Sequence, residues 1–186
     1  MKIFLDPGHG GDDLGATFED LNEKDIVLDV CRSAQNILQY RHWVAMSRNT
    51  DINIPLSSRC ELANKWGADI FLSVHCNADP DPDLPGMPEA NGEEIWIYPG
   101  SSSALILAKS IKNYVDDFFP LHGFRGIKEA PFFVLRETKM PAVLIEIGFI
   151  DHFNTAHALK KDYIKVRVGR LIARGVRKYE AHIRGA

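Results

Sequence analysis

KIFLDPGHGGDD, residues 2–13, is a short apolar run that stops at a proline and a group of glycines. The run Ile3 to Leu5 is typical of a buried parallel strand, and Pro7 with the glycines after it cannot continue that strand. Glycines on both sides of His9 allow a sharp turn and leave space above the imidazole ring. We therefore expect His9 to lie at the carboxyl end of a strand, open to an ion or a substrate.

Two further apolar runs place polar side chains in comparable positions. Ile70 to Val74 (IFLSV) predicts a second buried strand, which is followed directly by His75. Ala142 to Ile147 predicts a third, in which Glu146 interrupts the apolar run. A carboxylate in a buried strand is costly unless it is paired or used. Because the carboxyl ends of strands line the ligand crevice of open α/β sheets, His9, His75 and Glu146 are expected to converge.

The rest of the chain alternates between helical and strand patterns. Apolar residues at three- and four-residue spacing predict helices over Glu23 to about Tyr40 with Asn22 as N-cap, Leu56–Trp66, about Ser102–Phe118, and Ala156 to about Ile183. Further strands are expected at Trp43–Met46, Glu94–Tyr98 and Phe132–Leu135, with loops over residues 12–21, 78–93 and 122–130. This order predicts a single α/β domain, with a twisted, mostly parallel sheet of about six strands and helices on both faces.

Composition narrows the class of protein. A length of 186 residues with 45% hydrophobic content fits one domain with a sizeable core, and the net charge of −3 gives no reason to expect a nucleic-acid partner. Basic residues do gather near the end, between Lys160 and Arg184, where a solvated helix face is the simplest interpretation and a polyanionic surface the alternative. No apolar run reaches the roughly 20 residues that span a bilayer, and no export signal precedes the first strand.

The three cysteines, Cys31, Cys60 and Cys76, show no paired spacing, so no disulfide framework is expected. Cys76 adjoins His75, but successive strand residues point to opposite faces, which predicts a core position for it. The histidines outside the two strand ends lack a metal-like pairing and are expected at the surface or at helix ends: His42, His122, His152, His157 and His182.

Two imidazoles and one carboxylate are a common protein ligand set for a single Zn²⁺, which leaves a fourth position for water. If Glu146 acts as the catalytic base, another carboxylate must complete the metal shell, and the candidates are Asp12, Asp13, Glu19 and Glu23. We prefer Glu23, since it opens a predicted helix close to the glycine turn and is held by regular structure.

Ordered motifs along the chain resemble the zinc-dependent N-acetylmuramoyl-L-alanine amidases of the amidase 3 family of peptidoglycan hydrolases. The motifs are DPGHGG (6–11), EKD (23–25), SRNTD (47–51), the segment 59–64, ADIFLSVHCNA (68–78), RG (125–126) and FFVLRETKMPAVLIEIGFI (132–150). This resemblance implies that His9, Glu23 and His75 bind one zinc ion and that Glu146 is the catalytic residue. It also implies hydrolysis of the amide bond between the lactyl group of N-acetylmuramic acid and L-alanine.

Several expectations complete this interpretation. Residues 1–186 are expected to form one catalytic amidase domain without a separate wall-binding domain, acting as a monomer on peptidoglycan. Without a signal peptide, the chain would be made in the cytoplasm and reach the bacterial cell wall on lysis, or be a piece of a larger secreted protein. Asp6 is a candidate hydrogen-bond acceptor for a ligand histidine, and Arg136 is a candidate for substrate contact.

Two other functions stay open at this point. Another zinc amidohydrolase or carboxypeptidase could use the same two histidines and two glutamates. A catalytically silent module that binds the cell wall could keep the fold, although such a binder has no need of a buried carboxylate at position 146.

Overall fold

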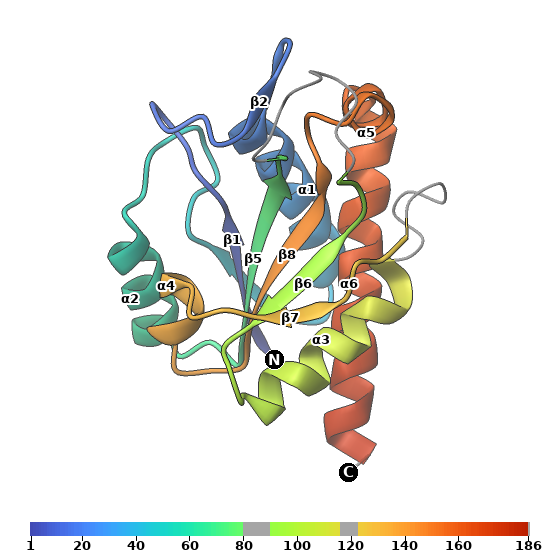
Figure 1. Ribbon diagram of the computed structural model, residues 1–186. Coiled ribbons are helices and arrows are strands. Elements are labelled where there is room, and N and C mark those ends of the chain that lie inside the picture. Colours follow the sequence, from blue (N-terminus) through green and yellow to red (C-terminus); the bar gives the residue numbers. More distant parts are fainter. Residues whose placement is uncertain (80–89, 116–122, 186) are drawn as a thin grey trace.

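The computed structural model describes residues 1–79, 90–115 and 123–185. Its centre is a six-stranded sheet in the order β4-β1-β5-β8-β6-β7 (Figure 1). The strands are β1 (Lys2–Pro7), β4 (Trp43–Met46), β5 (Ile70–Asn77), β6 (Glu94–Ile97), β7 (Ile127–Glu129) and β8 (Ala142–Phe149). All neighbouring pairs are parallel except β6 and β8, which confirms the predicted mostly parallel sheet.

Helices cover both faces of this sheet (Figure 1). The larger core lies between one face and the helices α1 (Glu23–Leu38), α3 (Ser102–Val115) and α6 (Asp162–Gly185), where alternate strand residues such as Ile3, Leu72 and Ile145 are buried. The smaller core lies on the other face under α2 (Leu56–Trp66) and α4 (Phe133–Arg136), around Phe4 and Phe71. The period-two pattern of the strands therefore separates two apolar cores of unequal size.

Strand register fixes which polar residues share a face. His75 on β5 lies directly beside Glu146 on β8, and Glu94 on β6 lies directly opposite Glu146 on the other side. Side chains that are adjacent across a sheet point to the same face. Three polar side chains therefore form a row across three neighbouring strands, on the face that α2 and α4 cover only in part.

Two parts of the predicted element list were wrong. Residues 132–135 were expected to be a strand, but Phe133–Arg136 is the single-turn helix α4, and the strand at this edge is β7, inside the expected loop 122–130. A run of four apolar residues does not distinguish a strand from a buried helical turn. Here Val134 and Leu135 pack into the smaller core, while Ile127 pairs with Ile95 of β6.

The last predicted helix is two helices, α5 (Phe153–Leu159) and α6. At the break, Lys160 forms ion pairs with Glu19 and Asp20, which lie at the tip of a small hairpin of β2 (Thr17–Phe18) and β3 (Leu21–Asn22). This hairpin lies within the expected loop 12–21. The spacing of apolar residues, from which the helix was predicted, gives no indication of this long-range contact with Lys160.

Some expectations fall partly or wholly outside the described residues. Most of the loop at 78–93, the last residues of the helix expected at 102–118, and His122 belong to this group. Within the part of the chain that the structure describes, no helix combines the length and the apolar character that crossing a membrane requires.

Candidate functional site

His9, Glu23 and His75 meet at the carboxyl ends of β1 and β5, although they are far apart in the sequence. One ligand atom from each lies within 4.8 Å of the others, and this is the one such group of metal-binding side chains in residues 1–79, 90–115 and 123–185. Glu23, at the start of α1, is 2% exposed and accepts contacts from both imidazoles: His75 Nδ1 at 2.9 Å and His9 Nε2 at 3.1 Å. Backbone N–H groups of Ala16 and Cys76 hold the same carboxylate.

The opposite ends of the two rings are also fixed. His9 Nδ1 lies 2.9 Å from both carboxylate oxygens of Asp13. His75 Nε2 lies 3.2 Å from the hydroxyl of Ser73, which in turn donates to Asp6 at 2.8 Å. The sequence suggested that Asp6 accepts a hydrogen bond from a ligand histidine. In the structure Asp6 instead contacts Ser73, which lies between it and His75.

The backbone turns sharply at His9, and hydrogen bonds from two buried arginines hold this turn. His9 has a φ of 56°, in the left-handed region, which costs a non-glycine residue of order 1–3 kcal/mol. The carbonyl groups of Pro7, Gly8 and His9 accept hydrogen bonds from two arginines that are each 2% exposed, Arg48 and Arg59. These arginines stabilise a turn that the local sequence alone would not hold.

Two glycines leave room for the group formed by His9, Glu23 and His75. A Cβ atom at Gly8 would lie 2.3 Å from the ring of His75, and one at Gly15 would lie 2.5 Å from Glu23 Oε2. The sequence suggested that glycine would clear space around His9. The structure shows that Gly15 does so, since its Cβ would lie 2.6 Å from His9 Cδ2, whereas Gly8 makes room for His75.

Glu146 lies next to this group but is not part of it. Its carboxyl group is largely buried, and its Oε2 atom has no hydrogen-bond partner among the described residues. Burial, together with the negative charges of Glu23 and Glu94, raises the pKa of Glu146 to about 7 against the opposing effect of His75. A carboxyl group of this kind can both accept and donate a proton near neutral pH.

Glu23 has the opposite electrostatic setting. Burial alone would raise its pKa, but hydrogen bonds from His75 and His9 hold the pKa of Glu23 well below its usual range. For His9, burial alone would lower the pKa. The hydrogen bonds and negative charges of Glu23 and Asp13 outweigh burial and raise the pKa of His9 to about 9. Glu23 is therefore suited to bind a cation, and Glu146 to move a proton.

The other carboxylate candidates lie elsewhere. Asp13 contacts the far side of His9, Asp12 lies near the side-chain amide of Asn53, and Glu19 pairs with Lys160. Arg136, proposed from the sequence as a substrate contact, is the last residue of α4 and forms an exposed ion pair with Glu137. All three cysteines are free and buried, as expected. His42 was expected at the surface or a helix end, but its side chain is 1% exposed.

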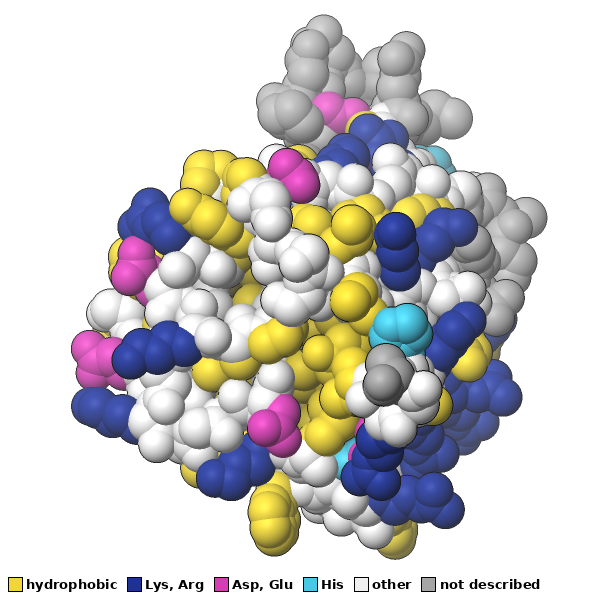
Figure 2. Space-filling view, turned by 90° about the horizontal axis from the view of Figure 1, so that it is seen from below, with side chains coloured by type: hydrophobic (Ala, Val, Ile, Leu, Met, Phe, Trp, Pro, Cys, Tyr) yellow, Lys and Arg dark blue, Asp and Glu magenta, His cyan; other side chains and the backbone are white. Residues whose placement is uncertain are grey.

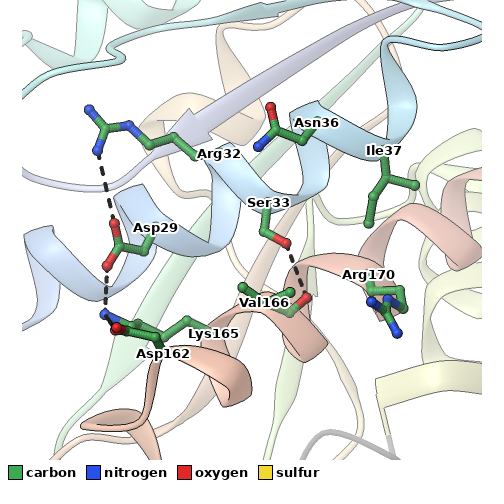
Figure 3. A pocket seen from close by; sticks show the side chains of 9 residues that line it. All are labelled: Asp29, Arg32, Ser33, Asn36, Ile37, Asp162, Lys165, Val166 and Arg170. Atoms are coloured by element: carbon green, nitrogen blue, oxygen red, sulfur yellow. Dashed lines mark hydrogen bonds and ion pairs between the residues drawn. The ribbon is translucent and has the colours of Figure 1, made fainter.

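A cleft of about 280 Å³ opens beside the two histidines. It is lined by Asp6, Gly8, His9, Asp13, Asn53, Ile54, Pro55, Leu56, Arg59 and His75. A larger pocket of about 490 Å³ lies between α1 and α6 (Figure 3), where Lys165 is held between Asp29 and Asp162. Its charges are largely paired with each other, and none of its lining residues belongs to the histidine site.

The surface at the opposite end of the sheet, where β4, β1, β5 and β8 begin, has a different character. Figure 2 shows this end, with hydrophobic side chains across its middle and Lys and Arg side chains gathered on the side where α6 lies in Figure 1. The exposed basic residues of α6 agree with a solvated helix face.

Comparison with known proteins gives one consistent family. Residues 3–178 match the family model described as N-acetylmuramoyl-L-alanine amidase. The chain is 39% identical over 181 residues to the N-acetylmuramoyl-L-alanine amidase CwlM of Bacillus licheniformis, covering 95% of this chain and 67% of CwlM. It is 38% identical over 167 residues to the endolysin of Bacillus phage SPP1, covering 86% of this chain and 59% of the endolysin. The matched region is therefore about three-fifths to two-thirds of these relatives.

The fold also matches that of a solved member of this family. The crystal structure of an N-acetylmuramoyl-L-alanine amidase from Clostridium difficile 630 superimposes with a TM-score of 0.89 at 31% identity, covering 97% of this chain and 96% of that one. The predicted single α/β domain is thus an architecture that solved structures share over nearly their whole length.

Proposed function

Because this chain belongs to the N-acetylmuramoyl-L-alanine amidase family, we propose that it hydrolyses the amide bond between N-acetylmuramic acid and the L-alanine of the peptidoglycan stem peptide. The observation that carries the proposal is the convergence of His9, Glu23 and His75 beside Glu146. The site of action is then the bacterial cell wall.

The donor set suits one zinc ion. Two imidazole nitrogens and a carboxylate oxygen lie close enough to share a cation, and the second nitrogen of each ring already has a partner that fixes its orientation. We assign His9, Glu23 and His75 as its ligands. When bound, zinc lowers the pKa of a coordinated water towards roughly 7 and polarises the scissile carbonyl group.

Glu146 supplies the proton transfers. Its carboxylate accepts a proton from the attacking water as the water oxygen bonds to the carbonyl carbon. The same carboxyl group then donates a proton to the alanine nitrogen as the carbon–nitrogen bond breaks. The products are the lactyl carboxylate and a peptide with a free amino group on L-alanine. A pKa of about 7 suits both halves of this cycle.

Analysis of digested cell wall tests the proposal. Purified peptidoglycan is incubated with the protein in the presence of zinc, and the new amino termini are identified by chemical labelling and mass spectrometry. We expect peptides that begin with L-alanine, and no release once a chelator has removed the metal. New amino termini at another residue would support a different zinc hydrolase, and wall binding without any release would support a silent binding module.

A further inference from the structure

Glu94 is a second buried carboxylate beside Glu146, and the proposed reaction gives it no role. It lies on β6 directly opposite Glu146, and its side chain is 3% exposed. Four donors converge on it: Arg125 Nε at 2.7 Å and Lys128 Nζ at 2.6 Å on one oxygen, and Trp96 Nε1 at 3.1 Å and Asn77 Nδ2 at 3.5 Å on the other. Glu94 therefore anchors two cations next to the candidate catalytic residue.

Two cations on one carboxylate leave a net positive charge and unused donors. The side chains of Arg125 and Lys128 are 36% and 33% exposed, so both reach solvent above the buried Glu94. Arg125 uses Nε for Glu94 and Nη1 for a 3.5 Å contact with the carbonyl of Asn91, which leaves Nη2 without a partner in the described part of the chain. A lysine ammonium carries three N–H donors, of which Glu94 takes one.

These cations lie on one defined side of Glu146. The guanidinium of Arg125 lies 5.2 Å from the ring centroid of Phe149, three residues after Glu146 on β8. Lys128 lies over Trp96, 5.1 Å from the ring centroid, two residues after Glu94 on β6. Neighbouring strands are about 4.8 Å apart, which places Glu94 one strand from Glu146 and two strands from His75.

The exposed carboxylates on the other side of Glu146 already have partners. Asp13 contacts His9 at 2.9 Å, and Asp51, at the same glycine turn, forms an ion pair with Lys24 at 2.7 Å. Arg125 and Lys128 are instead two cations that share one carboxylate. A carboxylate on a substrate that lies across Glu146 is therefore attracted to the β6 side.

We propose that Arg125 and Lys128 form a carboxylate-binding subsite, which selects stem peptides whose second residue, the one after L-alanine, carries a free carboxylate. This inference rests on the proposed function, because it presumes that the scissile bond lies beside Glu146. Two extended residues span at most about 7 Å, which fits a carboxylate located one to two strand spacings from the reacting atoms. The muramoyl group, which has no carboxylate once its lactyl group is in the amide, then lies on the side of the histidines.

A purely structural role would give a different result. If Arg125 and Lys128 served only to neutralise Glu94, removing either one would affect every substrate equally. If they bind the carboxylate, the loss depends on the substrate. The test therefore compares two muramoyl peptides that are identical except at the second residue, where one carries a free carboxylate and the other the corresponding carboxamide.

The experiment measures kcat and KM with both peptides for the zinc-loaded wild type and for Arg125→Gln, Lys128→Gln and Arg125→Lys. Arg125→Gln and Lys128→Gln each keep one cation beside Glu94, and Arg125→Lys keeps two. Arg170→Gln, which removes an exposed arginine of α6, is the matched control, and thermal melting checks that each variant is folded.

We expect the wild type to favour the free carboxylate by about tenfold or more in kcat/KM, the size of effect that one hydrogen bond to a charged group produces. Arg125→Gln and Lys128→Gln should each lose most of this preference, because KM rises much more for the carboxylate peptide than for the carboxamide peptide. Arg125→Lys should keep part of the preference, and Arg170→Gln all of it.

Two outcomes overturn the inference in distinguishable ways. Equal cleavage of both peptides by the wild type, or an equal loss on both peptides in folded Arg125→Gln and Lys128→Gln, removes the subsite and leaves the amidase proposal in place. Cleavage of neither peptide by zinc-loaded wild type overturns the proposed function, and the subsite with it.

Discussion

Glu146 and Glu23 show how the same residue type is placed in two different electrostatic settings by its surroundings. Glu23 is surrounded by donors, and hydrogen bonds from His75 and His9 keep its pKa low. Glu146 has a buried oxygen without a partner among the described residues, and burial, with Glu23 and Glu94 adding to it, raises its pKa to about 7. This separation of pKa values supports the proposed roles, in which Glu23 stays charged and Glu146 exchanges protons.

The substitution Glu146→Gln tests this division. It keeps the size of the side chain but removes proton transfer, so we expect kcat for amide hydrolysis to fall by about 10²–10⁴-fold. Zinc content and melting temperature should stay at their wild-type values, since Glu146 is not assigned as a ligand. Glu61→Gln on α2, at an exposed glutamate, is the control. Activity within about threefold of wild type would exclude Glu146 as the proton carrier.

At the scale of elements, the turn after β1 depends on side chains from the next βα unit. Arg59 on α2 binds Asp6, Pro7 and His9, and it forms a buried ion pair with Asp6 at 2.7 Å. Arg48, just after β4, binds the carbonyl groups of Pro7 and Gly8. The orientation of His9 is thus set by β4 and α2 as well as by β1.

Arg59→Met should therefore damage both stability and the site. Removing one partner of a buried ion pair costs about 3–5 kcal/mol, because the other charge stays buried. We expect the free energy of unfolding, measured by urea denaturation, to fall by about this amount, with weaker zinc binding. Lys65→Met, in an exposed pair on the same helix, should change it by less than about 1 kcal/mol. Equal small losses in the two variants would contradict the proposed support of the turn.

His42 connects the end of α1 with α6. Its Nε2 atom lies 3.6 Å from Glu180, too far for a hydrogen bond, and neither ring nitrogen has a hydrogen-bond partner in the described part of the chain. Burial lowers the pKa of His42, the amino terminus, Arg177 and Arg184 lower it further, and Glu180 opposes the shift. The folded state therefore favours a neutral imidazole at this position.

This setting predicts a pH dependence of stability. As pH falls below about 6.5, the usual histidine pKa, the unfolded chain binds a proton at His42 before the folded protein does. The contribution of neutral His42 to the free energy of unfolding is thus fully present above that pH. It is lost as the pH falls towards the lower pKa of His42 in the folded state. Unfolding free energies measured from pH 7.5 to 5 should fall less steeply in His42→Gln than in wild type. Parallel curves would show that His42 does not titrate in this way.

At the scale of the whole molecule, the periodicity of apolar residues predicts the layers of the fold. The secondary-structure predictions that were wrong lie where tertiary contacts determine the local structure. Alternating buried strands and amphipathic helices were enough to predict a mostly parallel sheet covered on both faces. Phe132–Leu135 was misassigned because a short apolar run fits a strand or a helical turn equally well. The break before Asp162 was missed because Lys160 turns towards Glu19 and Asp20, which are distant in the sequence.

The convergence of His9, His75 and Glu146 could be predicted from the sequence, but the residues that hold them in place could not. His9 and His75 follow apolar strands, and Glu146 interrupts one, so local sequence singles them out. Arg48, Arg59 and Glu94 carry no such signal, because a charged residue in a loop, a helix or a strand end looks exposed until its partners are known. Buried cations that bind backbone carbonyl groups become visible only in three dimensions.

The most direct test of the account is a crystal structure of the zinc-loaded protein with anomalous diffraction recorded at the zinc absorption edge. We expect one strong anomalous peak, with His9, Glu23 and His75 each about 2.0–2.2 Å from it and Glu146 beyond bonding distance. A peak bound by other residues, or no peak in protein that hydrolyses peptidoglycan, would contradict the assignment of this site.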